Sequence, residues 1–262
     1  MNSSRNTALI TGASSGIGLE LANLFARDGN DLVLVARNEG KLRQLASRLE
    51  GEFGIATRVL AADLAKPHAA QELVMTLNVH EVTIDALVNN AGFGLSGPFV
   101  ATDLDKELEM IQVNIVALTE LTKLLLPGMV ARRSGRILNL ASTAAFQPGP
   151  LMAVYYATKA YVLSFSEAIA DELRDSGVTV TALCPGPTDT GFAAAASMES
   201  SRLFKVAKPM SSAAVARVGY EAMKRGKRVV IPGMLNKVVA QSIRVTPRRM
   251  VTSIVRKLQE RV

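Results

Sequence analysis

The chain has 262 residues, 48% of them hydrophobic, and a formal net charge of +7. This length suits one α/β domain with a sizeable core, and no apolar run approaches the ~18 residues that a membrane-spanning helix needs. One cysteine, Cys184, and two histidines, His68 and His80, exclude an internal disulfide and offer no zinc-type metal site. Because the N-terminus also lacks the apolar core of a signal peptide, we expect a cytoplasmic protein.

Short apolar or β-branched runs alternate with longer amphipathic stretches along the chain. The runs predict strands at residues 7–11, 31–36, 56–61, 86–89, 136–140, 178–183 and 228–231. Helical periodicity predicts helices near residues 16–28, 39–50, 67–78, 103–130, 153–175 and 211–225. Most of the strands are continuously apolar, which is typical of a parallel sheet buried on both faces. The alternation therefore predicts an α/β fold with a doubly wound parallel sheet between two layers of helices.

A Gly-rich turn, Thr11-Gly-Ala-Ser-Ser-Gly-Ile-Gly18, joins the first predicted strand to the first predicted helix. Free N–H groups and the helix dipole make such a turn an anion site, and glycines let a pyrophosphate approach the backbone closely. No Gly-Lys-Ser/Thr follows, which excludes a P-loop. The pattern predicts a dinucleotide phosphate site, with a Gly-rich turn that binds no ligand as the alternative.

The end of the second predicted strand indicates which dinucleotide would bind. An NAD site usually has Asp or Glu here, about 20 residues beyond the Gly-rich turn, to bond the ribose 2′-hydroxyl. Ala36 stands at this place, and Arg37 follows with a guanidinium suited to a 2′-phosphate. A solvated loop charge is the alternative for Arg37. The pattern favours NADP(H) over NAD(H).

Asn114 is a polar residue inside Met110-Ile-Gln-Val-Asn-Ile115, an apolar stretch of a predicted helix. Burying an amide without a partner is costly, so we expect its side chain to be hydrogen-bonded. The alternatives are a core amide that the backbone satisfies and a polar group with a part in the chemistry.

Tyr155 and Lys159 stand four residues apart in a predicted helix, so both side chains lie on one helical face. A free tyrosine titrates near pH ~10, and a fixed ammonium beside it would lower the pKa of the phenol. A phenol tuned in this way can pass a proton to or from a substrate oxygen. The neighbouring Tyr156 has no lysine four residues on, so Tyr155 is the candidate acid/base residue.

Several motifs occur together: Thr11-Gly-x-x-x-Gly-x-Gly18, Asn89-Asn-Ala-Gly92, Asn114, Ser142, Tyr155-x-x-x-Lys159 and Pro185-Gly186. Over about residues 5–232 the chain therefore resembles a short-chain dehydrogenase/reductase of the single-domain type. The resemblance implies a Rossmann-like, seven-stranded sheet, a nicotinamide cofactor and hydride transfer to or from a carbonyl carbon. The short Tyr–Lys interval differs from the enoyl-reductase branch, and the glycine spacing differs from the extended epimerase and dehydratase branch.

The resemblance assigns four catalytic residues. Tyr155 would be the general acid in reduction and the base in oxidation, and Lys159 would lower its pKa and bond the nicotinamide ribose. Ser142, at the end of the fifth predicted strand, would hydrogen-bond the substrate carbonyl, with Thr143 as the neighbouring alternative. Asn114 would hold a helix kink and a water that links Lys159 to solvent.

The resemblance also implies cofactor contacts along the carboxyl edge of the sheet. Asp63 would contact the adenine, with a turn or N-cap role as the alternative. Small residues after the fourth strand would let the adenosine ribose lie against the backbone, and Thr188 and Thr190 would contact the nicotinamide amide and the pyrophosphate. The implied set is Gly12, Ser14, Ser15, Gly16, Ile17, Gly18, Arg37, Asn38, Asp63, Leu64, Asn90, Ala91, Gly92, Tyr155, Lys159, Pro185, Gly186, Thr188 and Thr190.

The loops that would hold the substrate are largely apolar, and no Arg or Lys occurs in residues 143–158 to hold a small carboxylate. They include a loop at about residues 187–210, whose segment 193–202 we expect to be mobile. A hydrophobic ketone or aldehyde, such as a 3-oxoacyl, steroid-like or retinoid-like compound, is the expected substrate, although each side chain could instead be a core or oligomer contact. The apolar residues are Phe93, Leu95, Phe99, Phe146, Leu151, Met152, Phe192, Met198, Leu203 and Phe204.

Basic charge is concentrated at the C-terminus, where eleven Lys or Arg and one acid, Glu260, occur from Lys224 onward. Apolar residues at helical spacing predict an amphipathic helix there, flanked by basic side chains. We favour a helix packed on its own domain or on a partner subunit over one that lies on an anionic membrane. Residues 1–232 would form the catalytic domain and residues 233–262 a basic helical extension.

We therefore expect an NADP(H)-dependent enzyme that interconverts a carbonyl and an alcohol, acting as a reductase. The alternatives are a non-catalytic NADP(H)-sensing or scaffold protein on the same fold and an NAD-linked alcohol dehydrogenase. The resemblance implies a homodimer or homotetramer. No aromatic residues interleave the basic tail, which argues against nucleic-acid binding. The expected location is the cytoplasm, with peripheral contact at a membrane as the alternative.

Overall fold

The computed structural model describes residues 5–192, 202, 209–243 and 245–260. Most of the loop expected to be mobile, residues 193–202, lies outside the described residues. So do three expected substrate contacts, Met198, Leu203 and Phe204. Elsewhere the expected strands and helical segments are present, with ends shifted by at most three residues.

Seven strands form one parallel sheet in the order β3-β2-β1-β4-β5-β6-β9. β1 pairs with both β2 and β4, so the strand order reverses between these two neighbours. Open α/β sheets bind ligands beyond the carboxyl ends of the strands at such a point. The predicted seven-stranded, doubly wound sheet is confirmed. Its strands are β1 (Thr7–Thr11), β2 (Asp31–Ala36), β3 (Thr57–Ala61), β4 (Ala86–Asn89), β5 (Gly135–Leu140), β6 (Val178–Leu183) and β9 (Val229–Val230).

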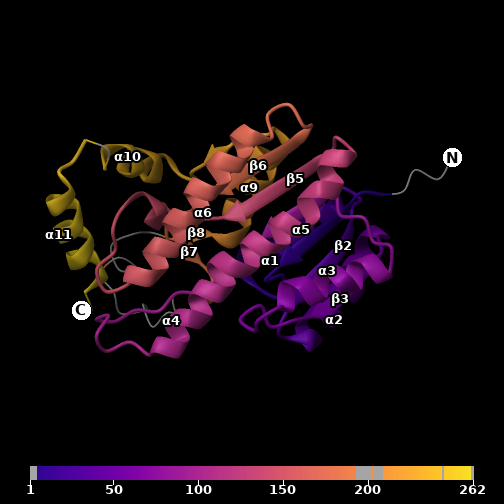
Figure 1. Ribbon diagram of the computed structural model, residues 1–262, viewed down its shortest axis with the longest axis horizontal. Helices are drawn as coiled ribbons and strands as arrows, with labels where there is room; N and C mark the ends of the chain where they lie inside the picture. The colour runs from indigo at the N-terminus through magenta and orange to yellow at the C-terminus, as the bar shows by residue number, and fades with distance from the viewer. Residues whose placement is uncertain (1–4, 193–201, 203–208, 244, 261–262) are drawn as a thin grey trace.

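Helices cover both faces of this sheet and give three layers (Figure 1). One face carries α1 (Gly16–Arg27), α2 (Glu39–Phe53) and α9 (Ser212–Lys224), and the other carries α3 (Ala69–Val79), α5 (Leu118–Ala131) and α6 (Ala153–Glu172). Each face has its own core because successive strand residues point to opposite sides. Thus Ile10 and Leu34 belong to one core, and their neighbours Leu9 and Val33 belong to the other.

The stretch predicted as one helix at residues 103–130 is continuous but changes its hydrogen-bonding pattern midway. A π-helical segment, η1 (Gln112–Ala117), separates α4 (Leu104–Ile111) from α5. π-helical turns are rare and often occur at functional sites. This segment contains Asn114, the polar residue that stands out in the apolar sequence.

The combined helix Leu104–Ala131 is long and apolar enough, by length and composition, to cross a membrane, contrary to the expectation from the sequence. Leu121 and Met129 on this helix are fully buried against the sheet. Packing in the domain core therefore accounts for part of its apolar character, since 39% of its apolar window is buried.

A chain of buried polar side chains crosses the centre of the sheet. Asn89 at the end of β4 donates from Nδ2 to Asn139 Oδ1 on β5 at 2.9 Å and to Thr122 Oγ1 on α5 at 3.1 Å. Asn139 donates in turn from Nδ2 to Ser166 Oγ on α6 at 2.9 Å. This network joins two central strands to two of the helices that cover them.

Two helices follow the last strand and lie at the end of the molecule opposite α2 and α3 (Figure 1). The basic amphipathic pattern forms α11 (Arg248–Gln259), and α10 (Met234–Ser242) precedes it. The inner side of α11 packs through Val251 and Val255 against a cluster that includes Tyr155 and Tyr156. The sequence reading missed α10 and a small parallel pair of strands, β7 (Thr188–Asp189) and β8 (Met210–Ser211).

Candidate active site

Ser142, Tyr155 and Lys159 meet beyond the carboxyl end of β5. Ser142 lies two residues after the strand and caps the short 3-10 helix η2 (Thr143–Phe146), where its hydroxyl oxygen accepts from Ala144 N at 3.1 Å. Tyr155 and Lys159 are both buried in the first turns of α6. Thr143, the alternative hydroxyl, uses its backbone N–H to bond the Pro185 carbonyl at 2.9 Å. That bond holds the loop after β5 to the loop after β6.

Lys159 is tied to the end of β5. Its Nζ donates to the Leu140 carbonyl oxygen at 2.7 Å and lies 5.9 Å from the centre of the Tyr155 ring. Burial lowers the pKa of Lys159 to about 8, because the charged form loses hydration. The ammonium is therefore positioned beside Tyr155 and titrates close to neutral pH.

Burial also dominates at Tyr155, whose side chain is 9% exposed. It raises the pKa of Tyr155 well above that of a free tyrosine, and a hydrogen bond with the Ser142 side chain offsets this only in part. The pKa of Tyr155 is therefore raised and not lowered as expected, because loss of hydration outweighs the effect of the Ser142 hydrogen bond. A neutral phenol carries the proton that a general acid must donate.

Asn114 is buried and its amide is paired. Nδ2 donates to the Phe93 carbonyl and to Thr158 Oγ1, both at 3.0 Å, and Oδ1 accepts from Phe93 N at 3.2 Å. No hydrogen bond between Asn114 and Lys159 occurs in the described residues. Both nevertheless face the space beside Gly92, where an added Cβ would lie 2.9 Å from Asn114 Oδ1 and 3.5 Å from Lys159 Nζ.

The Gly-rich turn forms a close cradle between β1 and α1. Gly12 has a φ of 66°, and an added Cβ would lie 2.7 Å from Asn90 Nδ2. A Cβ at Gly18 would collide with the Gly12 carbonyl oxygen, and one at Gly16 would lie 3.1 Å from Thr190. Ser15, the N-cap of α1, makes no side-chain capping bond.

These features fit a dinucleotide pyrophosphate, because the turn is bare of side chains and the first N–H groups of α1 have no capping side chain. Ser14 is half-buried, whereas Ile17 points into the core. Ser14, Ser15 and the N–H groups of Gly16 and Ile17 would therefore hold the phosphates, while the side chain of Ile17 packs in the core.

The loop after β4 is joined to the Gly-rich turn. Asn90 donates from Nδ2 to the Thr11 carbonyl at 2.8 Å, and the backbone N–H groups of Asn90 and Ala91 both bond Thr11 Oγ1 at 3.0 Å. Thr11, which had no individual role in the sequence reading, therefore fixes the two loops to each other. Its place as the first residue of the glycine motif is the feature of the sequence that could have predicted this role.

The end of β2 presents Arg37 to solvent, and in the described residues it forms no ion pair with a carboxylate. The next residue, Asn38, caps α2 by accepting from Lys41 N at 2.9 Å. Asp63 after β3 accepts from Ala65 N at 3.2 Å, which is the turn role considered as its alternative. Leu64 is buried in the core beneath it.

The loop after β6 brings the remaining predicted residues to the same edge. Thr188 donates to the Gly186 carbonyl at 2.9 Å, and Thr190 Oγ1 accepts from Phe192 N at 3.2 Å. Gly186 is in close contact with Asn236 of α10, a residue that the sequence reading did not consider. The carbonyl oxygen of Pro185 accepts from Ser142 Oγ at 3.4 Å, so this loop faces Ser142.

Apolar side chains surround Tyr155. Its ring centre lies 5.2 Å from that of Phe192, and a Cβ added at Gly94 would touch Phe192, Met152 and Tyr155 together. Phe93 and Leu95 pack against the same cluster. Of the other expected substrate contacts, Phe99 is 67% exposed, and Leu151 accepts from Gly97 N at 2.8 Å through its backbone carbonyl.

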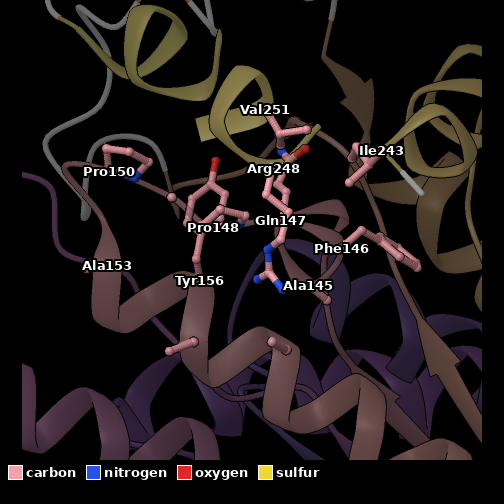
Figure 2. A pocket seen from close by; sticks show the side chains of 13 residues that line it. Ala145, Phe146, Gln147, Pro148, Pro150, Ala153, Tyr156, Ile243, Arg248 and Val251 are labelled. Carbon is pink, nitrogen blue, oxygen red and sulfur yellow. The ribbon is translucent and has the colours of Figure 1, made fainter. Parts of the chain in front are cut away.

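A hollow of about 720 Å³ lies on the other side of α6, beside Tyr156 (Figure 2). Its walls come from α6, the segment after β5 that includes Phe146, and the C-terminal residues Ile243, Arg248 and Val251. None of Ser142, Tyr155 and Lys159 lines it. It is therefore separate from the group of residues that can carry out proton transfer.

A sequence model of the family described as short chain dehydrogenase matches residues 6–200. The chain belongs to the short-chain dehydrogenase/reductase family. This short-chain dehydrogenase is 37% identical over 182 residues to the very-long-chain 3-oxoacyl-CoA reductase of Homo sapiens, and 36% identical over the same length to that of Anas platyrhynchos. Each match covers 68% of this chain and 58% of the relative, so the chain spans less than two thirds of the relatives' length.

Solved structures of short-chain dehydrogenases share the whole fold. A short-chain dehydrogenase from Sphingobium yanoikuyae in complex with NADPH is 35% identical, with a TM-score of 0.82 and coverage of 93% of this chain and 97% of that one. The bulky-bulky ketone specific alcohol dehydrogenase from Comamonas testosteroni is 32% identical, with a TM-score of 0.77 and coverage of 93% and 95%. The likeness to these two dehydrogenases therefore extends over nearly the whole of this chain and of each of theirs.

Proposed function

We propose that this protein is an NADP(H)-dependent reductase of hydrophobic ketones, with 3-oxoacyl thioesters as the leading substrate class. The observation that carries the proposal is the position of Tyr155. Its phenol holds a proton beside Ser142, while its ring packs against Phe192 and Met152. A carbonyl oxygen that accepts from Ser142 and Tyr155 would therefore have apolar substituents against this wall.

The residues of the chain supply the proton and the positioning for such a reduction. Bound NADPH would supply a hydride from its nicotinamide ring. Ser142 can donate a hydrogen bond to the carbonyl oxygen, and Tyr155 can transfer its proton to the same oxygen as negative charge develops there. The ammonium of Lys159 stabilises the phenolate that remains.

The proton of Tyr155 must then be replaced. Asn114 Oδ1 and Lys159 Nζ face the same small space beside Gly92. A water in that space, oriented by a hydrogen bond to Asn114 Oδ1, could carry a proton from solvent to Lys159 after Lys159 has passed its own proton toward the Tyr155 phenolate, which is the chemistry of a proton relay. The hydrogen bonds from Asn114 to Phe93 and Thr158 hold the amide in the orientation that this role requires.

Arg37 supports the preference for NADP(H). It follows Ala36 at the end of β2, where an acidic residue would bond the ribose of NAD, and its guanidinium is exposed. The Sphingobium yanoikuyae relative binds NADPH. A 3-oxoacyl-[acyl-carrier protein] reductase from Brucella melitensis with the same fold and 24% identity binds NAD, so the preference rests on Arg37 and not on the fold.

Three observations support a large apolar substrate. The wall around Tyr155 consists of Phe93, Leu95, Met152 and Phe192. No Lys or Arg occurs in residues 143–158 to hold a small carboxylate. The relatives include reductases of very-long-chain 3-oxoacyl-CoA and an alcohol dehydrogenase specific for bulky ketones.

A substrate screen tests the proposal. Purified protein would be assayed with NADPH and NADH on 3-oxoacyl-CoA thioesters of increasing chain length, on bulky aryl or steroid ketones and on small polar ketones. We expect kcat/KM to rise with apolar size and to be higher with NADPH. Activity confined to small polar ketones would contradict the substrate class.

The Tyr155→Phe variant tests the assignment of the acid. It should reduce kcat by at least ~100-fold, because general acid catalysis typically contributes that much, and leave NADPH affinity nearly unchanged. Tyr161→Phe is the matched control, since Tyr161 lies at the surface of the same helix and its hydroxyl bonds Thr119 Oγ1. Full turnover by Tyr155→Phe would reject the mechanism, and tight NADPH binding without turnover of any carbonyl would favour a sensing role.

A further inference from the structure

The two C-terminal helices expose an unusual amount of apolar surface. On α10, Leu235 is 75% exposed and Val238 is 58% exposed, and on α11 Met250 and Ile254 are 56% and 52% exposed. Met234 and Val239 add to the exposed face of α10. Clustered exposure of large apolar side chains usually marks a surface that binds a partner or a membrane.

The inner sides of the same helices pack against the domain. Ala240 of α10 is buried, and Val251 and Val255 of α11 pack beneath the helix against the domain. Gln259 at the end of α11 is tied to Tyr156 by a hydrogen bond of 2.6 Å. The exposed apolar residues therefore form a second stripe on the outer side of the two helices. The helices can present this stripe to a partner while their inner sides stay packed on the domain.

Basic side chains stand among these exposed apolar residues. Arg249 and Lys257 lie on the outer side of α11, Lys237 lies on α10, and all three are exposed. Within residues 209–243 and 245–260 none of them forms an ion pair with a carboxylate, whereas Arg256 lies 3.8 Å from Glu260. Part of the positive charge at the C-terminal end of the sequence is thus presented on the same two helices as the apolar side chains.

We propose that the outer face of α10 and α11 binds an anionic membrane surface. The proposed face consists of Met234, Leu235, Lys237, Val238, Val239, Arg249, Met250, Ile254 and Lys257. Helices of this composition lie in the interface plane, with apolar side chains among the acyl chains and cations at the headgroups. Each Lys or Arg close to an anionic surface contributes about 1 kcal/mol, or about fivefold in partition.

The charge pattern favours a membrane over a second copy of the chain. In a symmetric dimer each patch faces a copy of itself, so a patch that carries Lys237, Arg249 and Lys257 would face another patch with the same three positive charges. Like charges brought together across an interface are unfavourable. An anionic lipid surface neutralises all three and buries the apolar residues between them.

Cosedimentation with lipid vesicles tests this binding. The full chain would be mixed with vesicles of phosphatidylcholine alone and with vesicles in which half of the lipid is phosphatidylglycerol, at low and at high salt. We expect binding to the anionic vesicles that weakens as salt screens the charges. Equal binding to both compositions, or binding to neither at low salt, would overturn the proposal.

Paired substitutions locate the surface. Arg249→Gln with Lys257→Gln should weaken partition about 25-fold, because two cations of about fivefold each are removed. The matched control is Lys123→Gln with Lys227→Gln, which removes the same charge from exposed positions outside the two helices and should keep most of the binding. Equal losses in the two pairs would overturn the assignment to α10 and α11.

The apolar residues are tested in the same assay. Leu235→Asn with Val238→Asn should also abolish most vesicle binding, while circular dichroism and the unfolding midpoint report whether α10 remains folded. Sedimentation velocity of the native chain and of this variant identifies the competing outcome. If the native chain is a dimer that this variant dissociates, the face is an interface between copies, and the membrane proposal is wrong.

Discussion

Gln259 of α11 donates a hydrogen bond from Nε2 to the hydroxyl of Tyr156 on α6 at 2.6 Å. Both side chains are buried, and Tyr156 is the direct neighbour of Tyr155. The last helix of the chain is therefore anchored on the helix that carries the acid and the lysine of the candidate site. Apart from this bond the Gln259 amide is poorly satisfied, because its Oε1 has no partner in the described residues.

Tyr156→Phe should destabilise the protein by about 1–3 kcal/mol, because it leaves a buried amide without its acceptor. Urea unfolding measures the loss. Tyr161→Phe is the control, because the Tyr161 hydroxyl bonds Thr119 Oγ1 at 2.9 Å but is at the surface. That change should cost about 0.5 kcal/mol or less. If the two variants lose the same stability, the Gln259 bond does not hold α11 in place.

Arg37→Ala should separate the two cofactors. Loss of charge-assisted hydrogen bonds to a 2′-phosphate would cost about 1.5–3 kcal/mol, which is roughly a 10- to 150-fold rise in the Kd for NADPH. The Kd for NADH should change little, since it lacks that phosphate. Arg43→Ala on α2 provides a control with the same loss of charge at an exposed site. An equal effect of Arg37→Ala on both cofactors would reject its role at the 2′ position.

Gly12→Ala should reduce both stability and NADPH affinity, and Gly29→Ala should reduce stability alone. Both glycines have positive φ values, 66° and 79°, so an alanine costs roughly 1–2 kcal/mol at either. A Cβ at Gly29 would touch nothing within 4 Å, whereas a Cβ at Gly12 would lie 2.7 Å from Asn90 Nδ2. Unfolding curves and NADPH titrations of both variants distinguish backbone strain from damage to the cradle.

The rate of ketone reduction should fall as the pH rises through the pKa of Lys159. Burial lowers that pKa to about 8, so the ammonium loses its proton above this value. Burial raises the pKa of Tyr155, which keeps its proton over the same range. We expect kcat/KM with NADPH to be steady below about pH 7 and to decline up to about tenfold per unit above about pH 8.

The Lys159→Arg variant identifies the group responsible for that decline. Arginine stays charged at every pH of the assay, so the fall should disappear even if the altered geometry lowers the plateau. A decline that persists unchanged in this variant would mean that another residue titrates.

The residues with local signatures were predictable from the sequence. Tyr155 and Lys159 share a helical face because of their spacing, and the structure places both in the first turns of α6. Ser142 follows an apolar run, and the structure places it two residues beyond β5. Gly12 was recognisable because a bare turn between a strand and a helix needs a residue without a Cβ.

Other features depend on contacts between distant parts of the chain. The bond between Gln259 and Tyr156 spans 103 residues, and the contact between Asn236 and Gly186 joins α10 to the loop after β6. Neither leaves a local pattern. The pKa of Tyr155 was misjudged for the same reason, because the adjacent lysine is visible in the sequence and the apolar surroundings are not.

The paired amides of Asn89 and Asn139 make the central sheet intolerant of misalignment. These residues stand opposite each other in the parallel pairing of β4 and β5. A slip of one residue would turn Asn139 to the other face of the sheet and separate the two amides. Each hydrogen-bond partner lost in an apolar layer would lower the stability by about 1–3 kcal/mol. The paired amides therefore fix the register from which the loops that carry Gly92 and Ser142 leave the two strands.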